Sequence, residues 1–337
     1  MNEDPKNPTS VTPGSLFAFA EKQLVDLMTS NNVNRNVFRM FVQHWTETTY
    51  IDEANFDVNT RAIPQNFWNP LYTGVLKNLK SANELVPNGI ETAAVKANRE
   101  ACIELLNVYT YNVLVGTYGN IPYSQALDYT NVHPIYDDAA TINTDLLRRL
   151  EEALAKIDVT ADGFGSSDLL FGGDMTRWVT FANSLRLRMG INLADVDPTK
   201  AAALIAASEA GAVQTNGDNI AFQYLSSPPN ANPVWVDLVQ SGRKDFVGAN
   251  TLVDAMKGLN DPRIPAFFTQ DAAGGYSGGI YASSNNYATF SKPAVALTAP
   301  DYPSTLFSAS ETHFILAEAK ERGMAVSGTA AEHYEEA

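Results

Sequence analysis

Apolar side chains recur at helical spacing along most of the first 210 residues. The clearest stripe runs from 68 to 86, where apolar positions three and four apart form one continuous face. Ser15 and Asp174 can each cap a following helix, and Pro198 suits the first turn of another. The pattern predicts a mainly α protein, with helices over 15–30, 34–45, 68–86, 91–116, 138–157, 174–195 and 198–210.

Two stretches lack this period. Residues 1–14 contain Pro5, Pro8 and Pro13, which predict an extended lead-in. Residues 213–305 alternate short apolar pieces with Pro, Gly, Asn and Tyr, which predicts irregular loops, a few short strands and one short helix near 250–259. So long an irregular stretch is typical of functional loops on a rigid scaffold.

Helical periodicity returns near residue 310. A helix, Gly323 and a second helix with small residues resemble one tetratricopeptide unit. The pairs 68–86 with 91–116 and 174–195 with 198–210 are candidates for similar hairpins. Because Ala337 ends the chain inside an apparent helix, we expect that the single domain over 1–337 is truncated at its C-terminus.

Charge and cysteine content narrow the class of protein. The formal net charge of −15 repels phosphate backbones, so no nucleic-acid partner is expected. No run of 18 apolar residues predicts a transmembrane helix. Cys102 is the single cysteine, so an internal disulfide is impossible, and its apolar surroundings indicate a small core residue.

The search for catalytic and metal-binding motifs gives little. The histidines His44, His133, His313 and His333 show no metal-ligand spacing. Residues 275–279 match the Gly-x-Ser-x-Gly pattern of hydrolases, but they lack the flanking strand and helix that this motif needs. We therefore predict no catalytic residues, no metal site and no cofactor, although a calcium ion held by loop oxygens has no sequence signature.

A pair of carboxylates across a cleft, as in a glycoside hydrolase, is harder to exclude. Asp52, Glu53 and Asp57 lie together in a predicted loop. Solvated loop charge is the simpler interpretation. A glycoside hydrolase on a helical scaffold, and a tetratricopeptide-type scaffold that binds peptides, stay as alternative functions.

Aromatic rings in the irregular segments have no helical face to explain them. Trp45, Trp68 and Trp178 fit helical core stripes, but the others suit a flat, polar recognition surface. Sugars bind by stacking their C–H faces on such rings. The predicted ligand-binding residues are Tyr50, Phe56, Trp235, Tyr276, Tyr281, Tyr287 and Tyr302, beside Asn230, Asn232, Asn285 and Asn286.

Several segments, in order along the chain, resemble the SusD/RagB family, in particular its SusD-like branch. The last of them, HFILAEA at 313–319, precedes the Arg322-Gly323 pair. The others are NEDPKNPT at 2–9, QHW at 43–45, FWNPLY at 67–72 with Ala82-Asn83, GNIPYSQA at 119–126 and DPR at 261–263.

The resemblance implies tetratricopeptide-like hairpins with an irregular ligand region, and no catalysis. It implies a surface-exposed, lipid-anchored outer-membrane protein of Bacteroidetes-type bacteria that captures a nutrient, in the first place a glycan, for a SusC-like TonB-dependent transporter. Residues 50–62 and 270–302 match the ligand region by position. The lipid-bearing cysteine and the C-terminal quarter to third of the family are absent from this chain.

Overall fold

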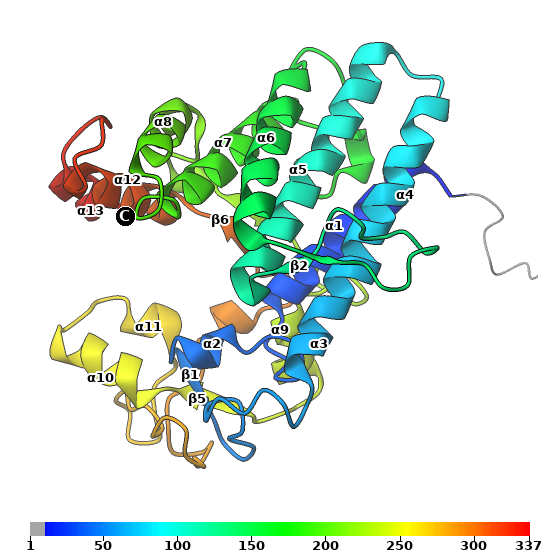
Figure 1. Cartoon of the computed structure of the whole chain (residues 1–337). Coiled ribbons are helices and arrows are strands. Elements are labelled where there is room, and N and C mark those ends of the chain that lie inside the picture. The colour runs from blue at the N-terminus through cyan, green and yellow to red at the C-terminus, as the bar shows by residue number, and fades with distance from the viewer. Residues whose placement is uncertain (1–10) are drawn as a thin grey trace, which may run out of the picture. The chain divides into compact units, whose positions relative to one another are not determined.

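The computed structural model describes residues 11–337, which are mainly helical, as predicted (Figure 1). The expected lead-in over 1–14 therefore falls largely outside the described residues. The helices are α1 (Pro13–Thr29), α2 (Phe38–Phe41), α3 (Ile63–Asn69), α4 (Lys77–Leu85), α5 (Ala93–Tyr118), α6 (Ala139–Lys156), α7 (Met175–Ile191), α8 (Pro198–Ser208), α9 (Pro233–Trp235), α10 (Asn250–Gly258), α11 (Ile264–Phe267), α12 (Ala309–Glu321) and α13 (Ala330–Glu336). The strands are β1 (Trp45–Glu47), β2 (Ile121–Pro122), β3 (Tyr136–Asp137), β4 (Ile220–Phe222), β5 (Phe246–Gly248) and β6 (Ser304–Phe307), paired as β1–β5, β2–β3 and β4–β6.

The described chain divides into two compact units. Unit 1 comprises the segments up to Leu24, Leu71–Phe222 and Thr305–Ala337. Unit 2 comprises Val25–Pro70 and Gln223–Ser304. Each unit joins segments that lie far apart in the sequence. The single domain expected over 1–337 stays a prediction.

Unit 1 is built from helices that pack against their neighbours in sequence. The main pairs are α4 with α5, α5 with α6, α7 with α8, and α12 with α13 (Figure 1). These pairs confirm the predicted helical hairpins. Asp174 caps α7 as predicted, because its carboxylate accepts the backbone N–H groups of Thr176 and Arg177.

Some predicted helix boundaries are wrong. Helix α1 begins at Pro13 rather than at a Ser15 cap, and the Thr12 hydroxyl accepts the Ser15 N–H. The helical stretch predicted to start at Trp68 begins at Ile63 and continues to Leu85 through a π-helical turn, Pro70–Leu76. Pro70 has no backbone N–H, so a regular α pattern cannot run through it.

The helix predicted over 34–45 is also wrong. Only α2, Phe38–Phe41, is helical there. Gln43 then adopts a left-handed conformation with φ of 58°, and Trp45 begins strand β1. Three threonines follow Trp45 within four residues, and such β-branched residues favour extended chain. Trp45 is nevertheless buried in a core, as are Trp178 and Cys102, while Trp68 is half-buried.

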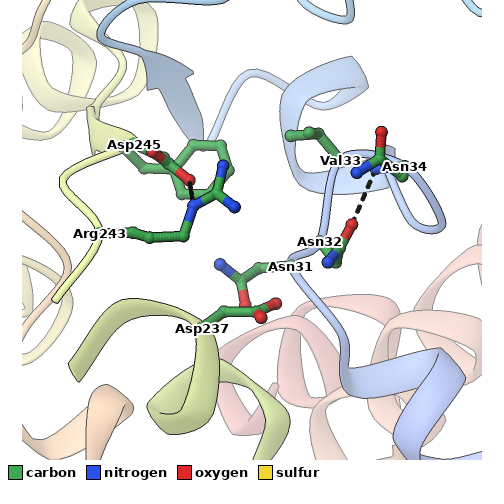
Figure 2. A pocket seen from close by; sticks show the side chains of 8 residues that line it. Asn31, Asn32, Val33, Asn34, Asp237, Arg243 and Asp245 are labelled. Atoms are coloured by element: carbon green, nitrogen blue, oxygen red, sulfur yellow. Dashed lines mark hydrogen bonds and ion pairs between the residues drawn. The ribbon is translucent and has the colours of Figure 1, made fainter. Parts of the chain in front are cut away.

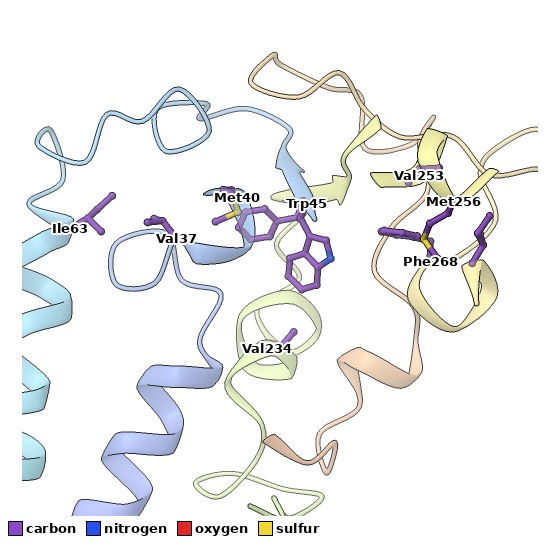
Figure 3. Close-up of a cluster of buried hydrophobic side chains, with 10 residues drawn as sticks. Val37, Met40, Trp45, Ile63, Val234, Val253, Met256 and Phe268 are labelled. Carbon is purple, nitrogen blue, oxygen red and sulfur yellow. The ribbon is translucent and has the colours of Figure 1, made fainter. Parts of the chain in front are cut away.

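Unit 2 has little regular structure, and its core sits around a two-stranded sheet. Strand β1 pairs antiparallel with β5, with Trp45 opposite Gly248 and Glu47 opposite Phe246. A Cβ on Gly248 would lie 2.7 Å from the Phe268 ring, so only glycine fits there. The predicted short helix at 250–259 is confirmed as α10. The buried cluster contains Val37, Met40, Trp45, Ile63, Val234, Phe246, Val253, Met256, Ile264 and Phe268 (Figure 3).

No helix among residues 11–337 is long and apolar enough to cross a membrane.

A buried carboxyl pair in unit 1 makes stability depend on pH. Glu21 and Asp168 are 0% and 3% exposed. Asp168 accepts the Trp178 indole N–H at 2.8 Å and three backbone N–H groups near Leu170, and Glu21 accepts the Leu169 N–H at 2.7 Å. Burial first, and then the Asp168 charge, raise the pKa of Glu21 well above its usual value. The raised pKa favours the uncharged form of Glu21 beside Asp168 in the folded protein.

We predict that Glu21→Gln stabilises the protein at pH 8. A raised folded-state pKa gives stability that is complete below the unfolded value of about 4.5 and is lost as pH rises. Glutamine is uncharged at every pH, so Glu21→Gln should be more stable than the wild type at pH 8, and this advantage should vanish near pH 4. Urea unfolding at both pH values measures this. The exposed Glu84→Gln is the control, with a change within about 0.5 kcal/mol at both. An equal effect of Glu21→Gln at pH 4 and pH 8 would contradict the raised pKa of Glu21.

Candidate ligand-binding site

All the aromatic residues predicted to bind ligand lie in unit 2. Tyr50, Phe56 and Tyr302 are exposed by 63%, 58% and 38%. The others are half-buried: Trp235, Tyr276, Tyr281 and Tyr287. Their role in ligand binding stays a prediction, but their surroundings separate rings that are free to stack from rings that hold the fold.

Two of the rings serve the fold. The Tyr281 hydroxyl donates to the Met40 carbonyl at 2.8 Å, and Tyr276 packs against the buried cluster of unit 2. Phe56 is partly covered by Phe41, whose ring centroid is 5.0 Å away. These contacts leave less of each ring for a ligand.

The remaining rings stand in more polar surroundings. The Tyr287 ring lies 6.0 Å from the Lys244 ammonium and 5.4 Å from that of Lys292. Trp235 ends the short helix α9, where the sequence predicted irregular chain. The Asn232 side-chain amide donates to the Tyr302 backbone carbonyl at 2.7 Å. This hydrogen bond does not involve the exposed ring of Tyr302.

Tyr50 is the most exposed ring of the set, and it makes a cation–π contact. The Arg61 guanidinium lies 5.3 Å from its centroid. Arg61 also forms ion pairs with Asp52 at 2.9 Å and with Glu53 at 2.8 Å. The loop carboxylates that could have belonged to a hydrolase therefore pair with Arg61, while Asp57 accepts the Thr60 hydroxyl and two backbone N–H groups of its own loop.

The chain brings the Tyr50 loop beside the segment around residue 285. The Asn285 amide donates to the Glu47 carbonyl at 3.0 Å, and its backbone N–H donates to the Thr48 carbonyl at 3.0 Å. Ser284 donates to the same carbonyl, and Asn55 reaches the Ala282 carbonyl at 3.0 Å. Segments that lie more than 200 residues apart thus form one surface.

Two of the four asparagines expected beside a ligand are used by the fold. Asn232 and Asn285 are 1% and 8% exposed, and their amides bond to backbone carbonyls. They position the loops and are not free to meet sugar hydroxyls. Asn286 is exposed, and its side-chain oxygen accepts the Ala288 N–H.

A small cavity of about 20 Å³ opens beside Tyr50. Its wall contains one complete ion pair, Arg243 with Asp245 at 2.6 Å, and also Arg61, which pairs with Asp52. Asp52 itself is not among the cavity residues. Those that shape the cavity are Glu47, Thr49, Tyr50, Arg61, Arg243 and Asp245. Apart from Tyr50, sequence reasoning missed them, because nothing in the sequence shows that residues near 50 and near 244 meet.

Glu47 lines this cavity and lies beside the Glu53 carboxyl. The two side chains belong to residues that are 2% and 0% exposed, and Glu47 also accepts the Ala54 N–H at 3.2 Å. Burial first, and then the neighbouring Glu53 carboxyl, raise the pKa of Glu47 to about 9. Glu47 therefore adds no negative charge to the cavity at neutral pH.

This acid pair does not match a glycoside hydrolase. Such an enzyme needs its two carboxyl groups on either side of the scissile bond, roughly 5–9.5 Å apart. Glu47 and Glu53 are 2% and 0% exposed, so a substrate cannot reach between their carboxyl groups. No group of three or more histidine, cysteine or acidic side chains within residues 11–337 could hold a metal ion.

The fold of this chain is similar to that of several solved structures. A SusD-like protein of Bacteroidetes matches with a TM-score of 0.81 at 22% identity, over 96% of this chain and 75% of its own. A chitin-binding SusD homologue from Flavobacterium johnsoniae matches with a TM-score of 0.78 at 21% identity, over 95% and 69%. A SusD-like protein from Bacteroides thetaiotaomicron has a TM-score of 0.76 at 24% identity, over 96% and 68%.

No curated protein matches the sequence. The sequence itself matches the family described as "SusD-like_2: Starch-binding associating with outer membrane" over residues 5–337, nearly its whole length. The helical pairs and the long irregular segment agree with this match. The chain therefore belongs to the SusD-like family of starch-binding proteins that associate with the outer membrane.

Proposed function

We propose that this protein is a non-catalytic subunit that captures a glycan at the cell surface and passes it to a SusC-like TonB-dependent transporter. The observation that carries the proposal is the exposed Tyr50 ring beside a cavity whose wall contains Arg61 and the ion pair of Arg243 with Asp245. The family description, which names starch and the outer membrane, supports the same function. The protein would be lipid-anchored in the outer membrane.

The chemistry of the cavity wall suits sugar hydroxyls. Each hydroxyl both donates and accepts hydrogen bonds, and an ion pair offers a guanidinium donor and a carboxylate acceptor side by side. Arg243 with Asp245 is such a pair, and the Arg61 guanidinium adds further donors. Since the cavity encloses only about 20 Å³, it has room for a substituent, while the sugar ring itself would lie outside on Tyr50.

The ion pairs also argue for a neutral ligand. Arg61 is balanced by Asp52 and Glu53, and Arg243 by Asp245. No cation of this wall is left over to attract a sulfate or a uronate. A neutral oligosaccharide therefore fits better than an anionic one.

We predict that a glycan array will identify a neutral oligosaccharide as the ligand. Tyr50→Ala should weaken the binding of this oligosaccharide. The loss of one central stacking ring should raise Kd about tenfold or more, as measured by titration calorimetry. Tyr129→Ala is the matched control, because Tyr129 is 91% exposed in unit 1 and should leave Kd unchanged. Trp235→Ala and Tyr287→Ala then measure how far the surface extends from Tyr50.

A hit that Tyr50→Ala leaves unchanged would remove the Tyr50 cavity from the ligand site. Binding of peptides in place of any glycan would favour the tetratricopeptide-type scaffold.

We further predict no turnover. The purified protein, incubated with its array hit for a day, should return the oligosaccharide intact by mass spectrometry, because the side chains of Glu47 and Glu53 are buried away from a substrate. Release of shorter sugars, abolished by Glu53→Gln, would contradict a non-catalytic role.

A further inference from the structure

A second cavity of about 20 Å³ in unit 2 adjoins the Tyr50 cavity (Figure 2). The two share Val33, Arg243, Asp245 and Phe246 in their walls. The second cavity adds the loop that follows α1, residues 31–34, and Asp237. A ligand that lies on Tyr50 could therefore place a substituent in each cavity.

Asn31 is the unusual residue of this second cavity. It is 1% exposed, and neither the nitrogen nor the oxygen of its side chain has a hydrogen-bond partner in the described chain. Figure 2 shows its amide between Arg243 and Asp237. A buried amide without partners costs roughly 1–3 kcal/mol, so the fold alone does not explain it.

The charges around Asn31 select the kind of group that could pair with it. A cation would meet the Arg243 guanidinium, and an anion would meet Asp237 and Asp245. A neutral, dipolar group avoids both. The apolar Val33 and Phe246 in the same wall offer contact to a small apolar part, such as a methyl group.

An acetamido group combines these properties. Its carbonyl can accept a hydrogen bond from the Asn31 amide, its N–H can donate to the Asp237 carboxylate, and its methyl can pack on Val33 and Phe246. The Asn31 oxygen is then left for a neighbouring sugar hydroxyl. Burial raises the pKa of Asp237. Its side-chain oxygens can accept the hydrogen bond that the acetamido N–H donates.

We infer that this cavity binds the acetamido group of an N-acetylated sugar, with Asn31 as the residue that recognises it. The inference rests on the proposed glycan capture and narrows it to N-acetylhexosamine-containing glycans. Asn31 is a specificity residue in this account, while Tyr50 carries the sugar ring.

The test compares two β-1,4-linked tetramers, one of N-acetylglucosamine and one of glucose, which differ only at the acetamido position. Titration calorimetry should give a Kd about tenfold lower for the acetylated tetramer. Asn31→Ala should remove that difference by raising the Kd of the acetylated tetramer about tenfold and leaving that of the glucose tetramer unchanged. Asn88→Ala, an exposed asparagine in unit 1, should change neither.

Asn31→Ala should keep the melting temperature of the wild type, because the amide has no partner in the fold. Asn31→Asp keeps the size but loses the N–H donor, so it should also lose the preference. Equal Kd values of wild type for both tetramers would overturn the inference and leave glycan capture standing. The inference would also be overturned if the acetylated tetramer bound Asn31→Ala and the wild type equally, or bound neither. The proposed glycan capture would then be tested by the glycan array alone.

Discussion

The hydrogen bonds of Asn285 hold the irregular chain of unit 2 against strand β1. Its side-chain amide lies within hydrogen-bond distance of the Glu47, Ile280 and Ser283 carbonyls. Its backbone N–H donates to the Thr48 carbonyl. These bonds replace the ladder that a longer sheet would provide, because β1 and β5 pair over only three residues. The loop with Tyr50 starts where these contacts end, so the position of the candidate site depends on them.

Charge in unit 2 is arranged so that the site stays close to neutral within a strongly acidic protein. Arg61 and Arg243 each pair with nearby carboxylates, and Glu47 holds a proton. In unit 1, burial and the neighbouring Asp168 raise the pKa of Glu21 in the same direction. A buried carboxyl that keeps its proton can donate a hydrogen bond without bringing a second negative charge into the protein interior.

Local pattern was sufficient to predict most of unit 1. The helices and their caps depend on residues a few positions apart. Examples are the Asp174 cap of α7 and the apolar face over 68–86, which includes α4. Prediction failed at Trp45, whose helical spacing was overridden by pairing with Gly248 about 200 residues away. The exposed Tyr50 could be found because no helical face explained it, but Arg243 and Asn31 could not. The place of these two residues in a cavity wall depends on neighbours that are distant in sequence. The absence of hydrogen-bond partners for Asn31 can be seen only in the folded structure.

The most direct test of the account is a crystal structure of the protein with an oligosaccharide that it binds. The account predicts a sugar ring stacked on Tyr50, with hydroxyls bonded to the pair formed by Arg243 and Asp245. A sugar bound by the helices of unit 1, or on unit 2 away from Tyr50, would contradict it.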